Sequence, residues 1–409
     1  MRGKRFSIGL RATLAIVAVA LFATDTPAVA QETVLFSFNS TDGLNPVAGL
    51  IFDGAGNLYG TTLYGGANNY GAVFELTPST GGRWKETVLH SFNLNGTDGY
   101  RPYGGLIFDG SGNLYGTTFY GGANGEGTAY ELTPMAGGRW KEKVLHSFAA
   151  NGTDGYNPTA SLIFDGVGNL YGTTFYGGAN SSGTVFELKR AAGGSWKEKV
   201  LHNFTGADGD FPFASLIFDG SGNLYGTTIE GGDSGDGTVF ELAPSTGGSW
   251  TETVLQNFSG ADGDLPYAGL IFDGSGNLYG ATLNGGTYGN GTVFELTSSA
   301  GGIWTETVLH SFVGISDGSY PYGTLIFDTF GNLHGTTYYG GAHSDGTVFE
   351  LTPAGGGNWT ETVQHSFDNT NKDGYYPQAG LILDAVGNLY GTTEYGGSQN
   401  YGAVFRFAP

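Results

Sequence analysis

Residues 105–132 read GLIFDGSGNLYGTTFYGGANGEGTAYEL, and the centre of this stretch, Gly112-Asn-Leu-Tyr-Gly116, recurs through the whole chain. Successive copies are 54 to 56 residues apart. The copies begin at Gly56, Gly112, Gly168, Gly222, Gly276, Gly331 (with His in place of Tyr) and Gly387. A fixed period of this length indicates a repeat architecture, in which each copy forms one supersecondary unit.

Four segments of each repeat have the composition of β-strands. In the second repeat they are residues 86–92, 105–109, 113–118 and 127–132, which are rich in β-branched and aromatic residues and are separated by Gly, Asn, Asp and Pro. Groups of four short strands at a period of about 55 residues are typical of propeller blades. We therefore predict an all-β fold, a seven-bladed β-propeller of four-stranded blades.

The phase of the repeat predicts how the ring closes. Residues 32–38 are an isolated copy of the first segment, and the last repeat ends with its fourth segment at residues 402–407. In a closed ring the N-terminal strand would complete the last blade and remove two exposed sheet edges. A β-solenoid and an eight-bladed propeller are the alternatives. The second segment always opens with a small residue, which suits an innermost strand crowded around the axis; these residues are Gly49, Gly105, Ser161, Ser215, Gly269, Thr324 and Gly380.

The composition excludes several classes of protein. The 409 residues include 76 Gly, 28 Phe, 24 Tyr and no Cys, and the formal net charge is −21. This aromatic content supplies a core, so disorder is not expected. With only 16 Lys and Arg, the chain is a poor partner for nucleic acid or an anionic membrane. The lack of Cys removes disulfides, thiolate catalysis and cysteine metal sites.

Residues 1–30 have the pattern of a secretory signal peptide. Basic residues precede an apolar run at 12–23, and Ala28-Val-Ala30 forms a cleavage site before Gln31. Removing this segment changes the net charge from −21 to −24, because four basic residues and Asp25 are lost. We expect one propeller domain over 31–409, monomeric, not inserted in a membrane, and secreted to the periplasm, the cell surface or the medium. An uncleaved N-terminal anchor is the alternative.

The combination of Gly-Asn-Leu-Tyr-Gly-Thr-Thr, Tyr-Gly-Gly and Gly-Thr-Val-Phe-Glu-Leu resembles the Gloeo/Verruco (GloVer) tandem-repeat family of exported bacterial proteins. The resemblance covers residues 32–409. It implies an exported, often surface-anchored repeat protein, and the family carries no established catalytic residues to transfer. Because no C-terminal anchoring segment follows the last repeat, attachment to the cell is left open.

Residues that recur in every repeat are expected to serve the blade, because a catalytic constellation is asymmetric. We interpret the first Asp series as hairpin turn residues, the Trp series as packing between blades, and the second Asp series as Asx-turns, with Ca²⁺ ligation as the alternative for this last set. The first Asp series is Asp53, Asp109, Asp165, Asp219, Asp273, Asp328 and Asp384, and the second is Asp42, Asp98, Asp154, Asp208, Asp262, Asp317 and Asp373. The Trp series is Trp84, Trp140, Trp196, Trp250, Trp304 and Trp359. The His slot (His90, His146, His202, His310 and His365) also accepts Phe36 and Gln256, so it is not expected to be a metal site.

Two further slots vary between repeats and are expected on one face, opposite the Asp-Gly-x-Gly-Asn hairpins. One holds Tyr64, Tyr120, Tyr176, Glu230, Asn284, Tyr339 and Tyr395, and the other holds Leu44, Tyr100, Tyr156, Asp210, Asp264, Ser319 and Tyr375. Both lack aromatic residues in repeats four and five. Tyr103, Tyr320, Tyr322 and Tyr376 extend the aromatic set. Exposed Tyr beside Asn and Asp suits sugars, whose C–H faces pack on aromatic rings, and it also suits protein recognition. The alternative is that these rings only brace the loops.

The predicted function is therefore non-catalytic binding of an extracellular glycan or protein through the eight Tyr residues of the two slots. No catalytic motif is present, and no cofactor is expected. Two other hypotheses stay open: a polysaccharide-acting enzyme using Asp210, Glu230 and Asp264, and a purely structural or adhesive protein. Repeats four and five also gather carboxylates that could bind Ca²⁺; they are Asp208, Asp210, Glu230, Asp233, Asp236, Asp262 and Asp264.

Overall fold

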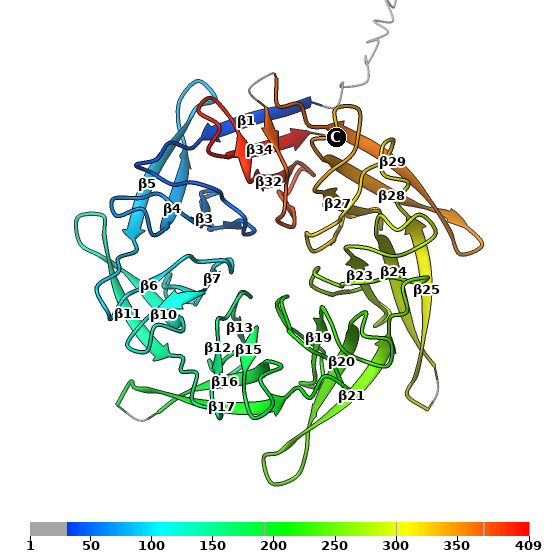
Figure 1. Ribbon diagram of the computed structural model, residues 1–409. Coiled ribbons are helices and arrows are strands. Elements are labelled where there is room, and N and C mark those ends of the chain that lie inside the picture. The colour runs from blue at the N-terminus through cyan, green and yellow to red at the C-terminus, as the bar shows by residue number, and fades with distance from the viewer. Residues whose placement is uncertain (1–30, 192, 300, 371–372, 409) are drawn as a thin grey trace, which may run out of the picture.

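The computed structural model of the chain describes residues 31–191, 193–299, 301–370 and 373–408. In these residues seven four-stranded antiparallel sheets are arranged in a ring (Figure 1). The prediction of a seven-bladed β-propeller is therefore confirmed, and the solenoid and the eight-bladed ring are excluded. The predicted signal peptide at residues 1–30 lies outside the described residues. Over the described ranges, no helix is long and apolar enough to span a bilayer.

Each blade runs from an inner strand at the axis to an outer strand at the rim. Blades one to three are β2(Ile51–Phe52), β3(Leu58–Thr62), β4(Ala72–Pro78), β5(Trp84–Ser91); β7(Ile107–Phe108), β8(Leu114–Thr118), β10(Thr128–Met135), β11(Arg139–Ser147); and β13(Ile163–Phe164), β14(Leu170–Thr174), β16(Thr184–Arg190), β17(Trp196–Asn203). Blades four to six are β18(Ile217–Phe218), β19(Leu224–Thr228), β20(Thr238–Pro244), β21(Trp250–Asn257); β22(Ile271–Phe272), β23(Leu278–Thr282), β24(Thr292–Ser299), β25(Ile303–Ser311); and β26(Ile326–Phe327), β27(Leu333–Thr337), β28(Thr347–Gly355), β29(Asn358–Ser366). Blade seven is β31(Ile382–Leu383), β32(Leu389–Thr393), β34(Ala403–Ala408) and β1(Gln31–Ser37).

The N-terminal strand closes the ring. β1 pairs antiparallel with β34, in a register that runs from Gln31 opposite Ala408 to Ser37 opposite Ala403 (Figure 1). Phe38, which follows β1, is fully buried and packs on Phe74 of blade one with ring centroids 5.0 Å apart. The strand therefore completes blade seven and seals it against blade one, as the phase of the repeat predicted.

The inner strands are shorter than predicted. In blade two only Ile107 and Phe108 pair with β8, whereas the sequence predicted a strand over 105–109. The small residue that opens each predicted inner segment lies before the strand and lines the axis. At Gly105, for example, an added Cβ would come within 2.9 Å of the Ser161 hydroxyl. Crowding at the axis therefore explains the small residues, and pairing with β8 is limited to Ile107 and Phe108.

The core lies between neighbouring blades. Tyr59 and Val73 of blade one, for example, share a buried cluster with Leu114, Tyr130 and Leu132 of blade two. Trp residues pack across the same junctions, as predicted, and each lies at the first or second position of an outer strand. Trp196 of blade three, for example, lies edge-on to Tyr115 of blade two at 6.4 Å.

Candidate functional site

The two variable slots pair directly across the loop face. Residues of the first slot face those of the second in every blade, either as isolated bridges or in the small sheets β6(Gly99–Tyr100)–β9(Tyr120–Gly121), β12(Gly155–Tyr156)–β15(Tyr176–Gly177) and β30(Gly374–Tyr375)–β33(Tyr395–Gly396). The predicted placement of both slots on one face is thus correct.

Three of these cross-strand pairs are Tyr–Tyr pairs. Tyr100 and Tyr120 stack with centroids 5.4 Å apart and ring planes at 25°, and Tyr375 and Tyr395 stack at 5.6 Å and 21°. Tyr156 and Tyr176 are tilted by 32° at 5.6 Å. Of the other two predicted Tyr residues, Tyr64 faces Leu44 and Tyr339 faces Ser319. Tyr339 is exposed and the others are half-buried, so one ring face of most of them is used in packing.

The residue after the second slot is held at positive φ in all seven blades, and none of these residues is Gly. In blade two, Arg101 (φ 57°) places its guanidinium 5.0 Å from the ring centre of Tyr64 and 5.5 Å from that of Tyr120. Cation–π contacts of this kind join adjacent blades. Positive φ in a bulky residue is strained and persists only where the surrounding structure holds it.

A cavity of about 370 Å³ opens on the axis. Each segment that crosses from one blade to the next contains a Pro, and the residue directly after this Pro lines the cavity in all seven cases. Four of these seven residues are aromatic: Tyr103, Phe213, Tyr267 and Tyr322. Ring contacts lead from the cavity outward, for example from Tyr103 to Phe119 (5.2 Å) and from Phe119 to Tyr120 (4.6 Å). The axial cavity and the Tyr pairs thus form one connected aromatic surface.

Blade seven breaks this surface with polar groups that sequence reasoning missed. Glu394 occupies a slot that holds Leu63, Phe119, Phe175, Ile229, Leu283 and Tyr338 in the other blades. Its Oε2 accepts hydrogen bonds from the Tyr338 hydroxyl and from the amide of Gln378, both at 2.8 Å. Gln378 itself lines the axial cavity. A slot-by-slot alignment of the seven repeats carries this signal.

The acidic residues of blades four and five separate into two groups. Asp210 and Glu230 pair across the loop face, and Asp264 pairs with Asn284. Burial, followed by the charges of Asp236 and Glu230, raises the pKa of Asp264. Burial also raises the pKa of Asp210, and the charges of Glu230 and Asp208 add to that shift.

The other three acids have different surroundings. Asp208 and Asp262 accept hydrogen bonds from His202 (3.1 Å) and Gln256 (3.0 Å), and Asp233 is exposed. No member of the sector belongs to the groups of three or more described residues whose ligand atoms lie within 4.8 Å of one another. The Ca²⁺ site stays a prediction.

The first Asp series serves the hairpins, as predicted. Asp109 Oδ1 accepts from the backbone N–H of Ser111 and Asn113, and its Oδ2 accepts from the Asn113 amide. These bonds outweigh the opposing effect of burial and lower the pKa of Asp109. The hydroxyl of Tyr115 lies between Asp109 (3.2 Å) and Glu131 (2.9 Å).

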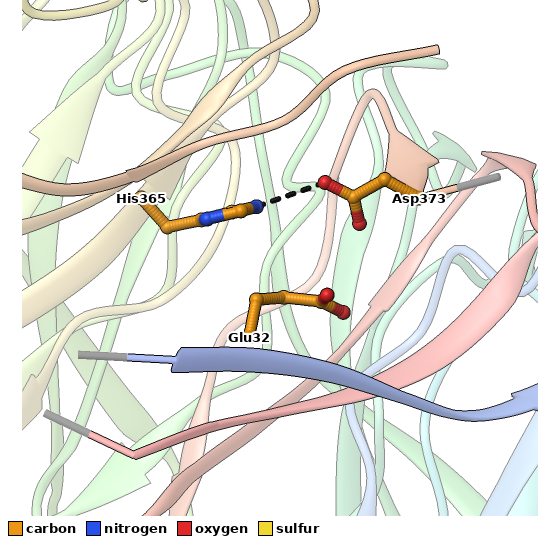
Figure 2. A group of neighbouring side chains, drawn as sticks. All are labelled: Glu32, His365 and Asp373. Carbon is orange, nitrogen blue, oxygen red and sulfur yellow. Dashed lines mark hydrogen bonds and ion pairs between the residues drawn. The ribbon is translucent and has the colours of Figure 1, made fainter. Parts of the chain in front are cut away.

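The second Asp series pairs with the His slot between blades, which was not predicted. Figure 2 shows the cluster at the ring closure, where His365 of β29 bonds Asp373 at 2.9 Å and Glu32 of β1 lies beside them. The same His–Asp pair recurs at four other junctions: His90–Asp98, His146–Asp154, His202–Asp208 and His310–Asp317.

A Glu of each outer strand completes every junction. Each has one buried carboxylate oxygen without a hydrogen-bond partner. Burial raises the pKa of Glu32 to about 8 and those of the other six to about 7. The six are Glu86, Glu142, Glu198, Glu252, Glu306 and Glu361. Because Gln or Phe replaces His at two junctions, we interpret these clusters as parts of the scaffold.

Comparison with known proteins gives a sequence family and a fold. The family model described as the Gloeobacter/Verrucomicrobia repeat matches residues 20–136, 82–273 and 249–409. No curated protein matches the chain. A candidate 6-phosphogluconolactonase from Bacteroides uniformis is similar in structure, with 13% identity, a TM-score of 0.51, and coverage of 90% of this chain and 100% of that one. At this identity the likeness shows the fold alone.

Two further solved structures are more distant. A candidate oxidoreductase (glucose dehydrogenase) from Thermus thermophilus has 14% identity and a TM-score of 0.46, covering 93% of this chain and 100% of that one. A protein of unknown function from Dyadobacter fermentans has 11% identity and a TM-score of 0.46, covering 92% and 97%.

Proposed function

Because the chain belongs to the Gloeobacter/Verrucomicrobia repeat family and folds as a seven-bladed propeller, we propose that it is an exported binding protein that recognises a glycan at the axial cavity and the aromatic surface around it. The observation that carries the proposal is the composition of this cavity. Tyr103, Tyr267 and Tyr322 supply aromatic rings, while Gln378 supplies an amide held by Glu394. Sugars present C–H faces and hydroxyls together, and such a wall can bind both.

The Tyr pairs extend the binding surface from the cavity toward the rim. Tyr120 and Tyr176 contact Phe119 and Phe175, respectively, with ring centroids 4.6 Å apart in both cases. Phe119 and Phe175 in turn contact the cavity residues Tyr103 and Phe213. A rigid aromatic surface that is already formed loses little conformational entropy when a ligand binds. An extended polymer can therefore contact the cavity and one or more Tyr pairs at once.

The enzyme hypothesis, with Asp210, Glu230 and Asp264, has weaker support. Glycoside hydrolysis needs two carboxyl groups on either side of one bond in a concave site. The wall of the axial cavity includes none of these three residues. A polar pair at the cavity, Gln378 and Glu394, gives one carboxylate, which is already bonded to two donors.

A glycan array or polysaccharide pull-down tests the proposal. We expect the wild-type protein to bind, and Tyr322→Ala, Tyr120→Ala and Tyr176→Ala to reduce binding, each by about 1–3 kcal/mol if a stacked ring is lost. Tyr288→Ala is the matched control, because Tyr288 is exposed on a loop and belongs to neither slot. Absence of glycan binding by the wild type, or equal binding by all four variants, would contradict the proposal.

A further inference from the structure

Blade six departs from the other blades at one buried position on the hairpin side. In the slot where six blades have Tyr, it has His334, which is 3% exposed. His334 lies opposite Glu350 on β28 and near Asp328 of the hairpin. Nδ1 of His334 is buried and has no hydrogen-bond partner, and Nε2 is 3.5 Å from Asp328 Oδ2, at the limit of a hydrogen bond.

The comparison with the other blades shows what this replacement removes. In blades one to five the Tyr hydroxyl lies between a hairpin and a strand carboxylate and bonds the strand Glu at 2.7 to 3.2 Å. The ring nitrogen at the tip of a His side chain reaches less far from the backbone than a Tyr hydroxyl does. The difference, about 2 Å, is close to the length of a bond between a metal ion and nitrogen. Blade six therefore keeps both carboxylates, loses the hydroxyl between them, and places a nitrogen ligand beside the space.

A second replacement in the same blade acts on the same group. Gln364 stands where the other outer strands have Leu, and its amide donates a hydrogen bond to Glu350 Oε2. The hydroxyl of Thr352 donates to the other oxygen of Glu350 at 3.2 Å. Asp328 Oδ1 accepts hydrogen bonds from the backbone N–H groups of Phe330 and Asn332, at 2.8 and 2.9 Å. The amide of Asn332 also donates to Asp328 Oδ2 at 2.9 Å. Both carboxylates are thus held in place by hydrogen bonds, as ligating carboxylates commonly are.

We propose that Asp328, His334 and Glu350 bind one Zn²⁺ ion. Their ligand atoms lie within 4.8 Å of one another. Three atoms so spaced are at most about 2.8 Å from a common point, so each needs to move by no more than about 0.7 Å to reach a Zn²⁺ bond of roughly 2.1 Å. One nitrogen and two carboxylate oxygens are a ligand set that Zn²⁺ accepts, and the two negative charges balance the ion.

The site has access to solvent. Asp328, His334 and Glu350 line a cavity of about 730 Å³, which is flanked by Phe330 and Val386. Zinc sites with three protein ligands leave a position for water or another ligand, and here that position would face this cavity. The hairpin side is opposite the loop face, so this site does not depend on glycan binding.

Two other groups of similar composition are weaker candidates. In Glu32–His365–Asp373 and His310–Asp317–Glu361, the His is already bonded to its Asp at 2.9 and 3.1 Å. They belong to a type of junction that recurs around the ring, and at two of the other junctions Phe36 or Gln256 stands in place of the His. They provide an internal control for the site in blade six.

Zn²⁺ titration of the chelator-treated protein by isothermal calorimetry tests the proposal, with Co²⁺ absorption as a second readout. We expect one saturable site per chain, lost in His334→Tyr, which restores the residue of the other blades and should fold. Glu350→Gln should weaken Zn²⁺ by tenfold or more, and Gln364→Leu by about 10–100-fold, as when a group that supports a ligand is removed. His365→Gln should bind like the wild type.

Three results would overturn the assignment. They are the absence of saturable Zn²⁺ binding in the wild type, unchanged binding in His334→Tyr, and loss of binding in His365→Gln. Unfolding midpoints measured in chelator establish that the variants are folded. If His334→Tyr does not fold, Glu350→Gln and the visible bands of bound Co²⁺ decide the question.

Discussion

Replacing Glu32 by Gln should stabilise the protein at pH 8 and have little effect at pH 5. Glu32 lies on the closing strand between blades seven and six, and burial, together with the charge of Asp373, raises its pKa from 4.5 to about 8 (Figure 2). The folded protein thus holds this proton more tightly than the unfolded chain. The contribution of this protonated carboxyl to stability is complete below pH 4.5 and is lost as the pH rises through 8.

The size of the effect follows from this pKa. Each unit corresponds to 1.36 kcal/mol, so the upper limit at pH 8 is about 4 kcal/mol. Because water screens a partly exposed side chain, we expect about 2 kcal/mol. At pH 5 most of the penalty has not yet developed, and the expected gain is below about 0.5 kcal/mol.

Urea unfolding followed by tryptophan fluorescence measures this difference. The wild type and Glu32→Gln are compared at pH 5 and pH 8, with Asp233→Asn, at an exposed carboxylate, as the control. An equal change in stability at both pH values would refute the reasoning. The pKa values of the six equivalent Glu residues are also raised. The stability of the wild type should therefore fall between pH 5 and pH 8.

Three other changes give distinct outcomes. Gly116→Ala should lower stability by about 1–3 kcal/mol, seen as a lower urea midpoint, because the new Cβ would meet the Tyr130 hydroxyl at 2.6 Å. Deleting residues 31–38 removes β1 and the buried Phe38, so a loss of at least about 3 kcal/mol and association through the free edge of β34 are expected by unfolding and size-exclusion chromatography. If the acidic sector binds Ca²⁺, the thermal midpoint rises with Ca²⁺ and this rise is lost in Asp210→Asn; equal midpoints with Ca²⁺ and with chelator would remove the site.

The fold could be predicted because every repeat carries the same local signals. Gly-Asn-Leu-Tyr-Gly marks a hairpin and a strand at a fixed period, and the isolated copy at 32–38 marks the closure. The placement of the two loop slots on one face also followed, since both could be aligned by their distance from fixed motifs, whereas their direct pairing was not predicted. The length of the inner strands could not be predicted, because crowding at the axis depends on all seven blades together.

The parts of the site that were missed are those where one blade differs from the rest. Glu394 has ordinary neighbours in sequence and is unusual only when compared with the same position of the other repeats. The replacement of Tyr by His at residue 334 is visible in the sequence, but its position beside Asp328 and Glu350 is not. The His–Asp pairs were missed for another reason. His90 and Asp98 each belong to a recurring series in the sequence, but nothing in their spacing shows that they touch. Their contact depends on how the chain turns between the end of the outer strand and the crossover. Such contacts are set by tertiary geometry rather than by local sequence.

The closure of blade seven also determines the order in which the protein can fold. Blades one to six are each built from one continuous segment, whereas blade seven joins residues 31–37 to residues 382–408. Bringing ends so far apart into contact costs about 5 kcal/mol of chain entropy, and this cost is offset only when the neighbouring blades already hold them close. Ring closure is therefore a late step that depends on the other six blades. A circularly permuted chain cut in another hairpin would transfer that late step to a different blade.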